Sequence, residues 1–541
     1  MPEKKTAKAG AKGSGNGTAT LSKESHAAGM SLLDLEYFKL FNALDLDSSG
    51  LVPLSRMLKV LKDIGIKSDD PRIKLSIFSN LEQGIIEDRK LTFDDFKEII
   101  KQSKGSLISD AIQGNLEIPA FKEFTNKIKS IFEKTKGVTD GKVATYIPQL
   151  GRVNPEQYAV SICSVSGQRE SFGDADKFFC IQSISKPVNY CLALEELGEE
   201  FVHKHVGREP SGISFNSLSL NKQGLPHNPM INSGAIMTCS MVKPQLEMAD
   251  RFDYVLDTWT RLCGGLPAKF NNSVYLSERQ TADRNFALGY FMRENKAFPD
   301  NTNLIDTLEF YFQCCSIEVS SDALSIAAAT LANGGICPIT GERIFKPDTV
   351  KNCLSLMYSC GMYDFSGEFA FTIGLPAKSG VAGGLMIVVP NLLGMAVWSP
   401  RLDAHGNSVR GLEFCKELVK DFNFHNYDSL ISASSNKVDP RLRKNESKID
   451  GVISLCFAAS TNDLLEIKQL VARGVNINDA DYDGRTALHL AASEGYLQIV
   501  QYLVNKGAAI NALDRWGNTP LDDARRGEHH EIVNYLSGQL S

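Results

Sequence analysis

A serine and a lysine stand three residues apart where an apolar run leads into a segment with helical periodicity. Ser183 lies near the predicted start of this helix, and Lys186 comes round to the same helical face, because residues three apart are neighbours on a helix. A serine hydroxyl is a poor nucleophile until a neighbouring base takes its proton. Lysine can be this base if burial and nearby positive charge lower its pKa, and the electropositive helix N-terminus adds to the effect. The pair therefore predicts nucleophilic catalysis by Ser183.

The spacing alone is weak evidence, since the S-x-x-K pattern occurs elsewhere in the chain as well. A second element supports it: Lys378-Ser379-Gly380 stands between two predicted strands, like the K-T-G of serine β-lactamases and penicillin-binding proteins. Small residues follow this triplet, so backbone N–H groups there could approach a substrate carbonyl. The backbone amides of Ser183 and Val381 are therefore the predicted oxyanion hole.

The elements that must position these residues lie in one long region, residues 116–424, which mixes helical periods with short β-rich runs. Strands are predicted at 158–165, 370–374 and 384–389, and a helix at 321–332. A sheet with a helical cluster is the natural architecture for such a mixture. We therefore predict an α/β catalytic domain.

The preceding region, residues 30–115, reads as helical and contains a loop with EF-hand spacing. Asp45, Asp47 and Ser49 supply oxygen atoms at loop positions one, three and five. The twelfth position, normally a bidentate glutamate, is Arg56. A cation there replaces the main anionic ligand, so we predict an EF-hand-like domain that binds no calcium.

The C-terminal region, residues 450–541, is repetitive. Residues 484–492 fit the T-P-L-H-x-A signature of ankyrin repeats, and residues 517–521 give a second copy 33 residues further on. Such repeats must stack on neighbours to bury their faces. They commonly bind proteins, but this block is short, and packing on the enzyme is an open alternative. The polar residues 425–449 form the predicted linker.

Composition excludes several classes of protein. The net charge of -6 argues against a nucleic-acid-binding protein, which would show a basic patch or stripe. No apolar run approaches the roughly 18 residues of a membrane span. The twelve cysteines lack zinc-site spacing, so we expect no metal and reduced thiols in an intracellular compartment. Residues 1–29 show neither a secretory nor a mitochondrial signal, and we expect a disordered tail.

Six segments, together and in this order, resemble the animal glutaminases of the kidney and liver types. They are residues 142–150, 182–187, 226–235, 277–285, 360–364 and 376–384. The resemblance covers about residues 30–541, and it is specific because the motifs are long. It implies a serine β-lactamase-like (DD-peptidase-like) catalytic domain between an EF-hand-like domain and ankyrin repeats. It also implies hydrolysis of L-glutamine to L-glutamate and ammonia.

The resemblance implies roles for residues around the reacting centre. Ser183 would attack the side-chain amide carbon, Lys186 would activate it, and the amides of Ser183 and Val381 would hold the oxyanion. Tyr146 and Tyr363 would lie close by, and one of them would relay a proton to departing ammonia. Ammonia is a poor leaving group unless it is protonated, so such an acid is needed.

The same resemblance implies a binding site for the amino-acid end of glutamine. Glu278 would bind the α-ammonium group. Asn232, Asn285 and Tyr311 would help to hold the α-carboxylate, with Gln182 packed beside them. These residue types make independent sense, since a carboxylate suits an ammonium group and amide or phenol donors suit a carboxylate.

Residues 212–225 resemble the family's regulatory loop near the contact between dimers, and Phe215, Ser217, Leu218 and Ser219 lie in it. The kidney-type pattern has a lysine at the position of Ser217 and a phenylalanine at that of Ser219, whereas Ser219 matches the liver type. We therefore expect an altered response to phosphate. We also expect weak binding of allosteric inhibitors that use the phenylalanine.

The family resemblance also implies a homotetramer, further assembly into filaments, and inorganic phosphate as an activator, with no cofactor. It implies a mitochondrial location, with a cytosolic one as the alternative. Two other functions remain open. The chain could be another serine hydrolase of the β-lactamase-like superfamily, although that would not explain the ankyrin repeats. It could also be an inactive ankyrin-bearing scaffold, in which Ser183 would not react with a glutamine-like electrophile.

Overall fold

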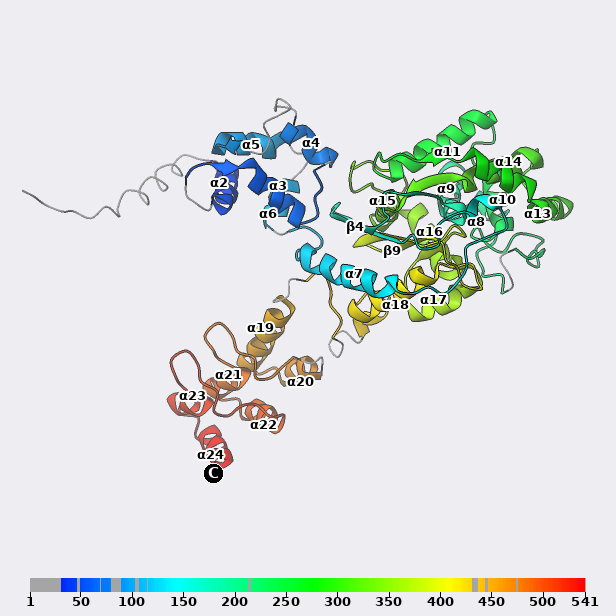
Figure 1. Ribbon diagram of the computed structural model, residues 1–541. Helices are drawn as coiled ribbons and strands as arrows, with labels where there is room; N and C mark the ends of the chain where they lie inside the picture. The colour runs from blue at the N-terminus through cyan, green and yellow to red at the C-terminus, as the bar shows by residue number, and fades with distance from the viewer. Residues whose placement is uncertain are drawn as a thin grey trace, which may run out of the picture. The chain divides into compact units, whose positions relative to one another are not determined.

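The computed structural model describes residues 31–45, 49–68, 70–78, 89–102, 107–113, 115–212, 216–430, 436–442, 446–472 and 475–540. The chain divides into two compact units (Figure 1). One comprises residues 1–63 and 67–115, and the other comprises residues 64–66 and 116–541. The predicted tail, residues 1–29, lies outside the described residues.

The first unit is helical, with one small sheet. Its described helices are α2 (Leu32–Leu44), α3 (Leu54–Asp63), α4 (Pro71–Phe78), α5 (Phe93–Gln102) and α6 (Leu107–Gln113). Strand β1 (Val52–Pro53) pairs antiparallel with β2 (Lys90–Leu91). Apolar residues at helical spacing, such as Phe41 and Phe96, form aromatic contacts that join the helices.

The EF-hand-like loop is closed by its own residues. The carboxylate of Asp45 accepts hydrogen bonds from the backbone N–H groups of Ser49 and Gly50, at 3.0 and 2.9 Å. Arg56 donates from Nη1 to the carbonyl oxygen of Leu44 at 2.9 Å. Asp47 lies outside the described residues. In the described part of the chain, no group of three or more His, Cys, Asp or Glu side chains could hold a metal ion.

The second unit contains a five-stranded antiparallel sheet in the order β4-β3-β10-β9-β8. Its strands are β3 (Ala159–Ser164), β4 (Arg169–Gly173), β8 (Ala377–Ser379), β9 (Gly384–Val389) and β10 (Leu393–Trp398). Strands β3, β9 and β10 are buried along their whole length. Strands β9 and β10 are continuous apolar runs, as in a sheet covered on both faces, whereas β3 also buries Ser161 and Ser164.

Helices cover both faces of this sheet (Figure 1). Helix α15 (Ser321–Ala332) packs on β3, β9 and β10. Helices α7 (Phe121–Lys136) and α18 (Val409–Asp421) share the opposite core. Side chains alternate between the two cores, as the strand period requires: Met386 and Val388 join one, and Ile387 and Val389 the other.

The rest of the catalytic region is mostly helical, with a short sheet in the order β5-β7-β6. The strands are β5 (Phe178–Cys180), β6 (Lys269–Phe270) and β7 (Ile317–Ser320). The helices are α8 (Pro148–Gly151), α9 (Ser185–Val202), α10 (Asn232–Met241), α11 (Met248–Leu262), α12 (Asn272–Gln280), α13 (Asp283–Glu294), α14 (Leu304–Cys315), α16 (Pro347–Cys360) and α17 (Ser366–Thr372). The region also contains the 3₁₀ turns η1 (Gln182–Ile184) and η2 (Tyr363–Phe365), and η3 (Asp428–Leu430) lies in the predicted linker.

One predicted strand is wrong. Residues 370–374 were expected to form a buried strand, but they lie at the end of α17, and the nearby strand is β8. A five-residue apolar run has too few residues to show a period, so it does not separate a strand from a helix end. Phe371 is 82% exposed, which a buried strand would not allow.

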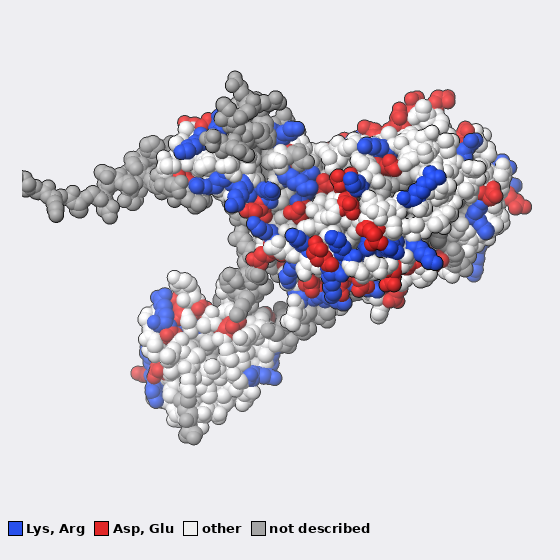
Figure 2. Space-filling model, in the orientation of Figure 1, with Lys and Arg blue, Asp and Glu red and all other residues white. Residues whose placement is uncertain are grey.

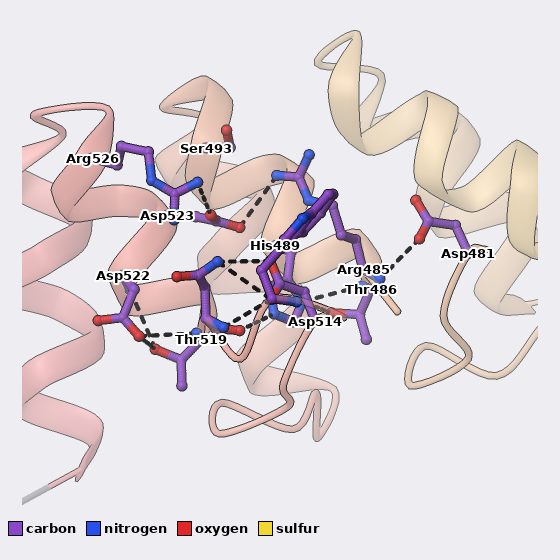
Figure 3. Close-up of polar contacts among 12 residues, drawn as sticks. Asp481, Arg485, Thr486, His489, Ser493, Asp514, Thr519, Asp522, Asp523 and Arg526 are labelled. Atoms are coloured by element: carbon purple, nitrogen blue, oxygen red, sulfur yellow. Dashed lines mark hydrogen bonds and ion pairs between the residues drawn. The ribbon is translucent and has the colours of Figure 1, made fainter. Parts of the chain in front are cut away.

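The C-terminal residues form three helix pairs in the region predicted to hold ankyrin repeats. The helices are α19 (Glu446–Ser460), α20 (Leu464–Ala472), α21 (Ala487–Glu494), α22 (Leu497–Asn505), α23 (Pro520–Arg526) and α24 (His530–Leu540). Thr486 and Thr519 form capping boxes at α21 and α23. Arg485 bonds Asp523 of the next repeat at 3.2 Å (Figure 3).

On the face of the catalytic region shown in Figure 2, basic and acidic side chains are interspersed over the surface. No basic stripe crosses that face. Among the described residues, none of the helices has the length and apolar character needed to cross a membrane.

Candidate active site

Ser183 and Lys186 meet at the junction between β5 and α9. Ser183 lies in the turn η1, and Lys186 lies in the first turn of α9. The Nζ atom of Lys186 is 2.8 Å from the Oγ atom of Ser183. Lys186 is fully buried, and Ser183 is 8% exposed. The structure thus brings the predicted nucleophile and its predicted base into hydrogen-bond contact.

Burial prepares Lys186 to act as a base. Desolvation by burial lowers the pKa of Lys186 to about 8, although Cys315, Cys239 and Glu278 each raise it in part. A buried lysine loses the hydration that stabilises its charged form, so a sizeable fraction is neutral near neutral pH. Neutral Lys186 has a lone pair that can accept the proton of Ser183.

Glu278 forms a second part of the site together with Gln182 and Tyr146. Its Oε1 atom accepts hydrogen bonds from the Tyr146 hydroxyl at 2.5 Å and from Gln182 Nε2 at 3.0 Å. Burial raises the pKa of Glu278, while the bonds from Tyr146 and Gln182 lower it. Both donors are neutral, so the carboxylate is hydrogen-bonded without being neutralised. A buried carboxylate of this kind is suited to bind a substrate ammonium group.

Tyr146 stands at the edge of the site. Its side chain is 47% exposed, but its hydroxyl is turned inward to Glu278 and to Gln182 Oε1, the latter at 3.2 Å. Burial of the hydroxyl raises the pKa of Tyr146 well above its ordinary value, and the charge of Glu278 adds to this effect. The Tyr146 hydroxyl is therefore engaged with the carboxylate.

Tyr363 is a buried residue in the turn η2. Burial raises the pKa of Tyr363, and the proximity of Ser183 and of the Val381 backbone lowers it in part. Its φ is +52°, a left-handed conformation that is uncommon for a non-glycine residue. Tyr363, Ser183 and Val381 therefore meet at one point, which is where a substrate carbonyl would be attacked.

The glycine-rich turn after β8 brings Val381 to this point. A Cβ atom on Gly380 would come within 2.6 Å of the carbonyl oxygen of Ile181, and one on Gly383 within 2.2 Å of that of Ser399. Only glycine allows such close backbone approach. The triplet Lys378-Ser379-Gly380 was predicted between two strands, but its first two residues belong to β8.

Asn232, the first residue of α10, connects the base to the remaining predicted residues. Its Oδ1 atom accepts a hydrogen bond from Lys186 Nζ at 2.8 Å and one from the Tyr311 hydroxyl at 3.4 Å. Its Nδ2 atom donates to Asn285 Oδ1 at 3.2 Å and to Asn216 Oδ1 at 3.3 Å. Of the three residues expected at the substrate carboxylate, Asn232 thus contacts both of the others.

The structure also adds residues that sequence reasoning did not assign to the site. Asn216 reaches Asn232 from the predicted regulatory loop. The buried thiol of Cys315 raises the pKa of Lys186 in part, and its interaction with the Tyr311 hydroxyl, in which the phenol is the donor, raises that of Tyr311. Asn216 lies in a segment that the family resemblance had singled out, but nothing in its spacing linked it to Asn232. Cys315 belongs to no motif with a recognisable spacing.

The regulatory loop is described only in part. Phe215 lies outside the described residues. Ser219 donates its backbone N–H to the carbonyl oxygen of Ser217 at 3.0 Å, and Leu218 is 46% exposed. These local features do not test the expected responses to phosphate and to allosteric inhibitors, which stay predictions.

Comparisons with known proteins agree with this geometry. The family model described as Glutaminase matches residues 141–427, a region that contains every predicted site residue. Ankyrin repeats (3 copies) match residues 455–540, and an EF-hand domain matches residues 37–119. The fold class predicted from the sequence is confirmed.

Relatives and solved structures cover the same regions. The chain is 44% identical over 429 residues to the glutaminase liver isoform, mitochondrial, of Rattus norvegicus, which covers 79% of this chain and 71% of the rat protein. It is 44% identical over 321 residues to the glutaminase of Nostoc sp. (strain PCC 7120), covering 59% of this chain and 95% of the Nostoc protein. The solved structure named "Probable glutaminase ybaS" has a TM-score of 0.51 at 33% identity, covering 54% of this chain and 95% of that one.

A second solved structure, of Mglu in its native form, has a TM-score of 0.52 at 29% identity and covers 64% of this chain and 96% of that one. The family match spans the whole region that carries the site, and the rat relative aligns with most of the chain. This chain belongs to the glutaminase family.

Proposed function

We propose that this protein hydrolyses L-glutamine to L-glutamate and ammonia through an acyl-enzyme on Ser183. The observation that carries the proposal is the 2.8 Å contact between Lys186 Nζ and Ser183 Oγ within the glutaminase-family region. A neutral lysine beside a serine hydroxyl is the arrangement that nucleophilic catalysis needs. The buried carboxylate of Glu278 adds a site for an amino-acid substrate.

The reaction can be followed atom by atom. Lys186 takes the proton of Ser183 as Oγ forms a bond to the side-chain amide carbon of glutamine. The backbone N–H groups of Ser183 and Val381 stabilise the oxyanion of the tetrahedral intermediate. Its C–N bond then breaks, with a proton passing to the nitrogen so that ammonia leaves. Water next attacks the acyl-enzyme, which releases glutamate and returns the proton to Ser183.

Tyr363 is the better of the two tyrosines for relaying the proton to ammonia. Its pKa is lowered in part by the proximity of Ser183, whereas the Tyr146 hydroxyl is bonded to Glu278 at 2.5 Å. A proton relay must lie within hydrogen-bond reach of the reacting atoms. We therefore assign the relay to Tyr363 and give Tyr146 the task of orienting Glu278.

Specificity follows from the amino-acid end of the substrate. Glu278 pairs with the α-ammonium, and Asn232, Asn285 and Tyr311 donate to the α-carboxylate. A site whose buried polar groups need a partner discriminates strongly against a substrate that lacks one. An amide without these two charged groups is therefore a poor substrate.

The test compares the natural protein with Ser183→Ala by following ammonia and glutamate release from glutamine. We expect activity to disappear in the variant while its circular dichroism and melting temperature stay unchanged. A glutamine-like electrophile should label Ser183 in the natural protein alone. If the natural protein releases no ammonia under any condition, the inactive-scaffold alternative replaces this proposal, and the ankyrin surface becomes the functional part.

We further propose that the protein is a homotetramer activated by inorganic phosphate, without a cofactor, and that it works in mitochondria. The mitochondrial location is supported by the name of the rat relative, and a cytosolic form is the alternative. The ankyrin repeats suggest a protein partner. Light scattering with and without phosphate, alongside activity, tests the assembly. A monomer with phosphate-independent activity would contradict both proposals.

A further inference from the structure

Lys378 is a fully buried lysine that the proposed reaction does not use. It lies in β8, three residues before Val381, and its side chain has no exposed surface. Its Nζ atom donates to the carbonyl oxygen of Gly361 at 3.0 Å and to that of Ser379 at 2.8 Å. Both acceptors are backbone groups, so the side chain joins two segments of the chain.

The first of these segments is the turn that carries Tyr363. The carbonyl oxygen of Gly361 accepts from Lys378 and also from the backbone N–H of Ser379 at 3.2 Å. A Cβ atom on Gly361 would lie 1.8 Å from the carbonyl oxygen of Ala377, so the turn is pressed against β8. Lys378 Nζ also lies 4.5 Å from the centre of the Tyr363 ring.

The backbone conformation of this turn must be stabilised by its contacts. Tyr363 has a φ of +52°, and such a conformation persists only where its surroundings hold it. On one side, the Ser366 hydroxyl donates to the carbonyl oxygen of Tyr363 at 2.7 Å and accepts from the backbone N–H of Met362 at 3.0 Å. On the other side, Lys378 fixes Gly361.

We propose that Lys378 is a positioning residue that clamps the Tyr363 turn to β8, so that the phenol hydroxyl is held against Ser183 and the Val381 amide during proton transfer to ammonia. The inference rests on the proposed function, in which Tyr363 relays this proton. Its basis is geometric: Lys378 links the segment that holds the proton relay to the segment that holds the oxyanion.

The clamp works through hydrogen bonds and does not require charge. Burial lowers the pKa of Lys378 well below its ordinary value, and the nearby charge of Lys186 lowers it further. A neutral amine still has two N–H groups, one for each carbonyl oxygen. A glutamine side chain at this position would also supply two N–H donors, whereas a methionine side chain would fill similar space with none. The pair Lys378→Gln and Lys378→Met therefore separates hydrogen bonding from volume.

The experiment measures kcat and KM for glutamine and for the γ-thiomethyl ester of glutamate. Methanethiolate leaves without a proton, so the thioester does not need the relay. For Lys378→Met we expect kcat for glutamine to fall on the order of 100-fold, the low end of a general-acid contribution, with KM within about threefold. In the same variant, kcat for the thioester should fall less than about tenfold. For Lys378→Gln we expect kcat for glutamine to lie between the values of Lys378→Met and the natural protein.

Equal losses on both substrates would overturn the inference, because they would show damage to the oxyanion side or to the whole site. An unchanged glutamine rate in Lys378→Met would also overturn it, as would a Lys378→Gln variant no better than Lys378→Met. If Lys378→Met does not fold, Ser366→Ala replaces it, because this change removes the other hydrogen bonds that hold the turn. Its kcat must then fall more for glutamine than for the thioester. Ser183→Ala keeping activity on both substrates would instead refute the proposed function.

Discussion

Lys186 can accept the proton of Ser183 only in molecules in which it is neutral, so the pH dependence of the reaction reports its burial. The pKa of Lys186 is lowered to about 8, chiefly by desolvation. We expect kcat/KM to rise with pH through about 8 and then level off, because deprotonation creates the base. A profile measured at constant phosphate checks this. A midpoint near 10.5, the ordinary value, would show that burial does not tune the base.

Glu278 provides the charge that distinguishes a free amino acid from other amides. In Glu278→Gln the shape remains but the charge is lost, so a charge-assisted bond worth about 1.5–3 kcal/mol disappears. We expect kcat/KM for glutamine to fall about 10- to 150-fold. Glu309→Gln is the matched control, since Glu309 is paired with Arg279 at 2.5 Å outside the site. Equal effects of the two changes would refute the assignment of Glu278 to the ammonium.

The sequence predicts some site residues from spacing and others only from resemblance. Ser183 and Lys186 share one helical turn, so local geometry alone makes them neighbours. Glu278 and Tyr311 come from separate helices, and only long motifs shared with a family could place them together. The contact from Lys378 to Gly361 joins β8 to the turn after α16, and no local pattern specifies such a pair.

At the scale of elements, the sheet and α15 approach each other closely at one glycine. A Cβ atom on Gly394 of β10 would lie 2.0 Å from the backbone nitrogen of Ala329 in α15. Gly394→Ala must push helix and strand apart, and we expect the catalytic domain to lose about 1–3 kcal/mol of stability, as overpacked cores do. Gly367→Ala in α17 is the control, since nothing lies within 4 Å of its Cβ position. Equal melting temperatures for both variants would contradict the close packing.

Helices and strands with a long and clear hydrophobic pattern were predictable from the sequence, whereas a short apolar run was not. The helix at residues 321–332 appears where the pattern places it, because its length shows a helical period. The strand at residues 384–389 appears there as well, as a continuous apolar run buried on both faces. Residues 370–374 do not form a strand: residues 370–372 end α17, and residues 373–374 follow it. The ankyrin helices were predictable for a different reason. The same sequence motif occurs twice at a fixed spacing, so each copy supports the assignment of the other.

At the scale of the whole molecule, chemistry and repeats occupy different parts of the chain. The Nostoc relative aligns over 95% of its own length while covering 59% of this chain, so a glutaminase can consist of little more than the catalytic region. All predicted catalytic and substrate-binding residues lie within residues 141–427. We therefore expect that the repeats can be destabilised without a change in catalysis. A substitution inside the repeats tests this expectation.

His489 is the residue to change, because it joins two repeats from a fully buried position. Its Nδ1 accepts from the backbone N–H of Thr486 at 3.1 Å, and its Nε2 contacts the carbonyl oxygen of Asn518 at 3.2 Å (Figure 3). His489→Ala leaves both backbone groups buried without this partner, a loss of about 1–3 kcal/mol. We expect the melting transition of the repeats to fall while kcat for glutamine stays constant.

Calorimetry and activity of the same samples test this separation, with His530→Ala as the control at an exposed position. The control should change neither quantity, because no buried hydrogen bond depends on an exposed imidazole. If kcat of His489→Ala falls at temperatures where the catalytic transition has not begun, the repeats support the active site. In that case the ankyrin block acts as part of the enzyme, and deletion of the repeats should reproduce the loss of kcat.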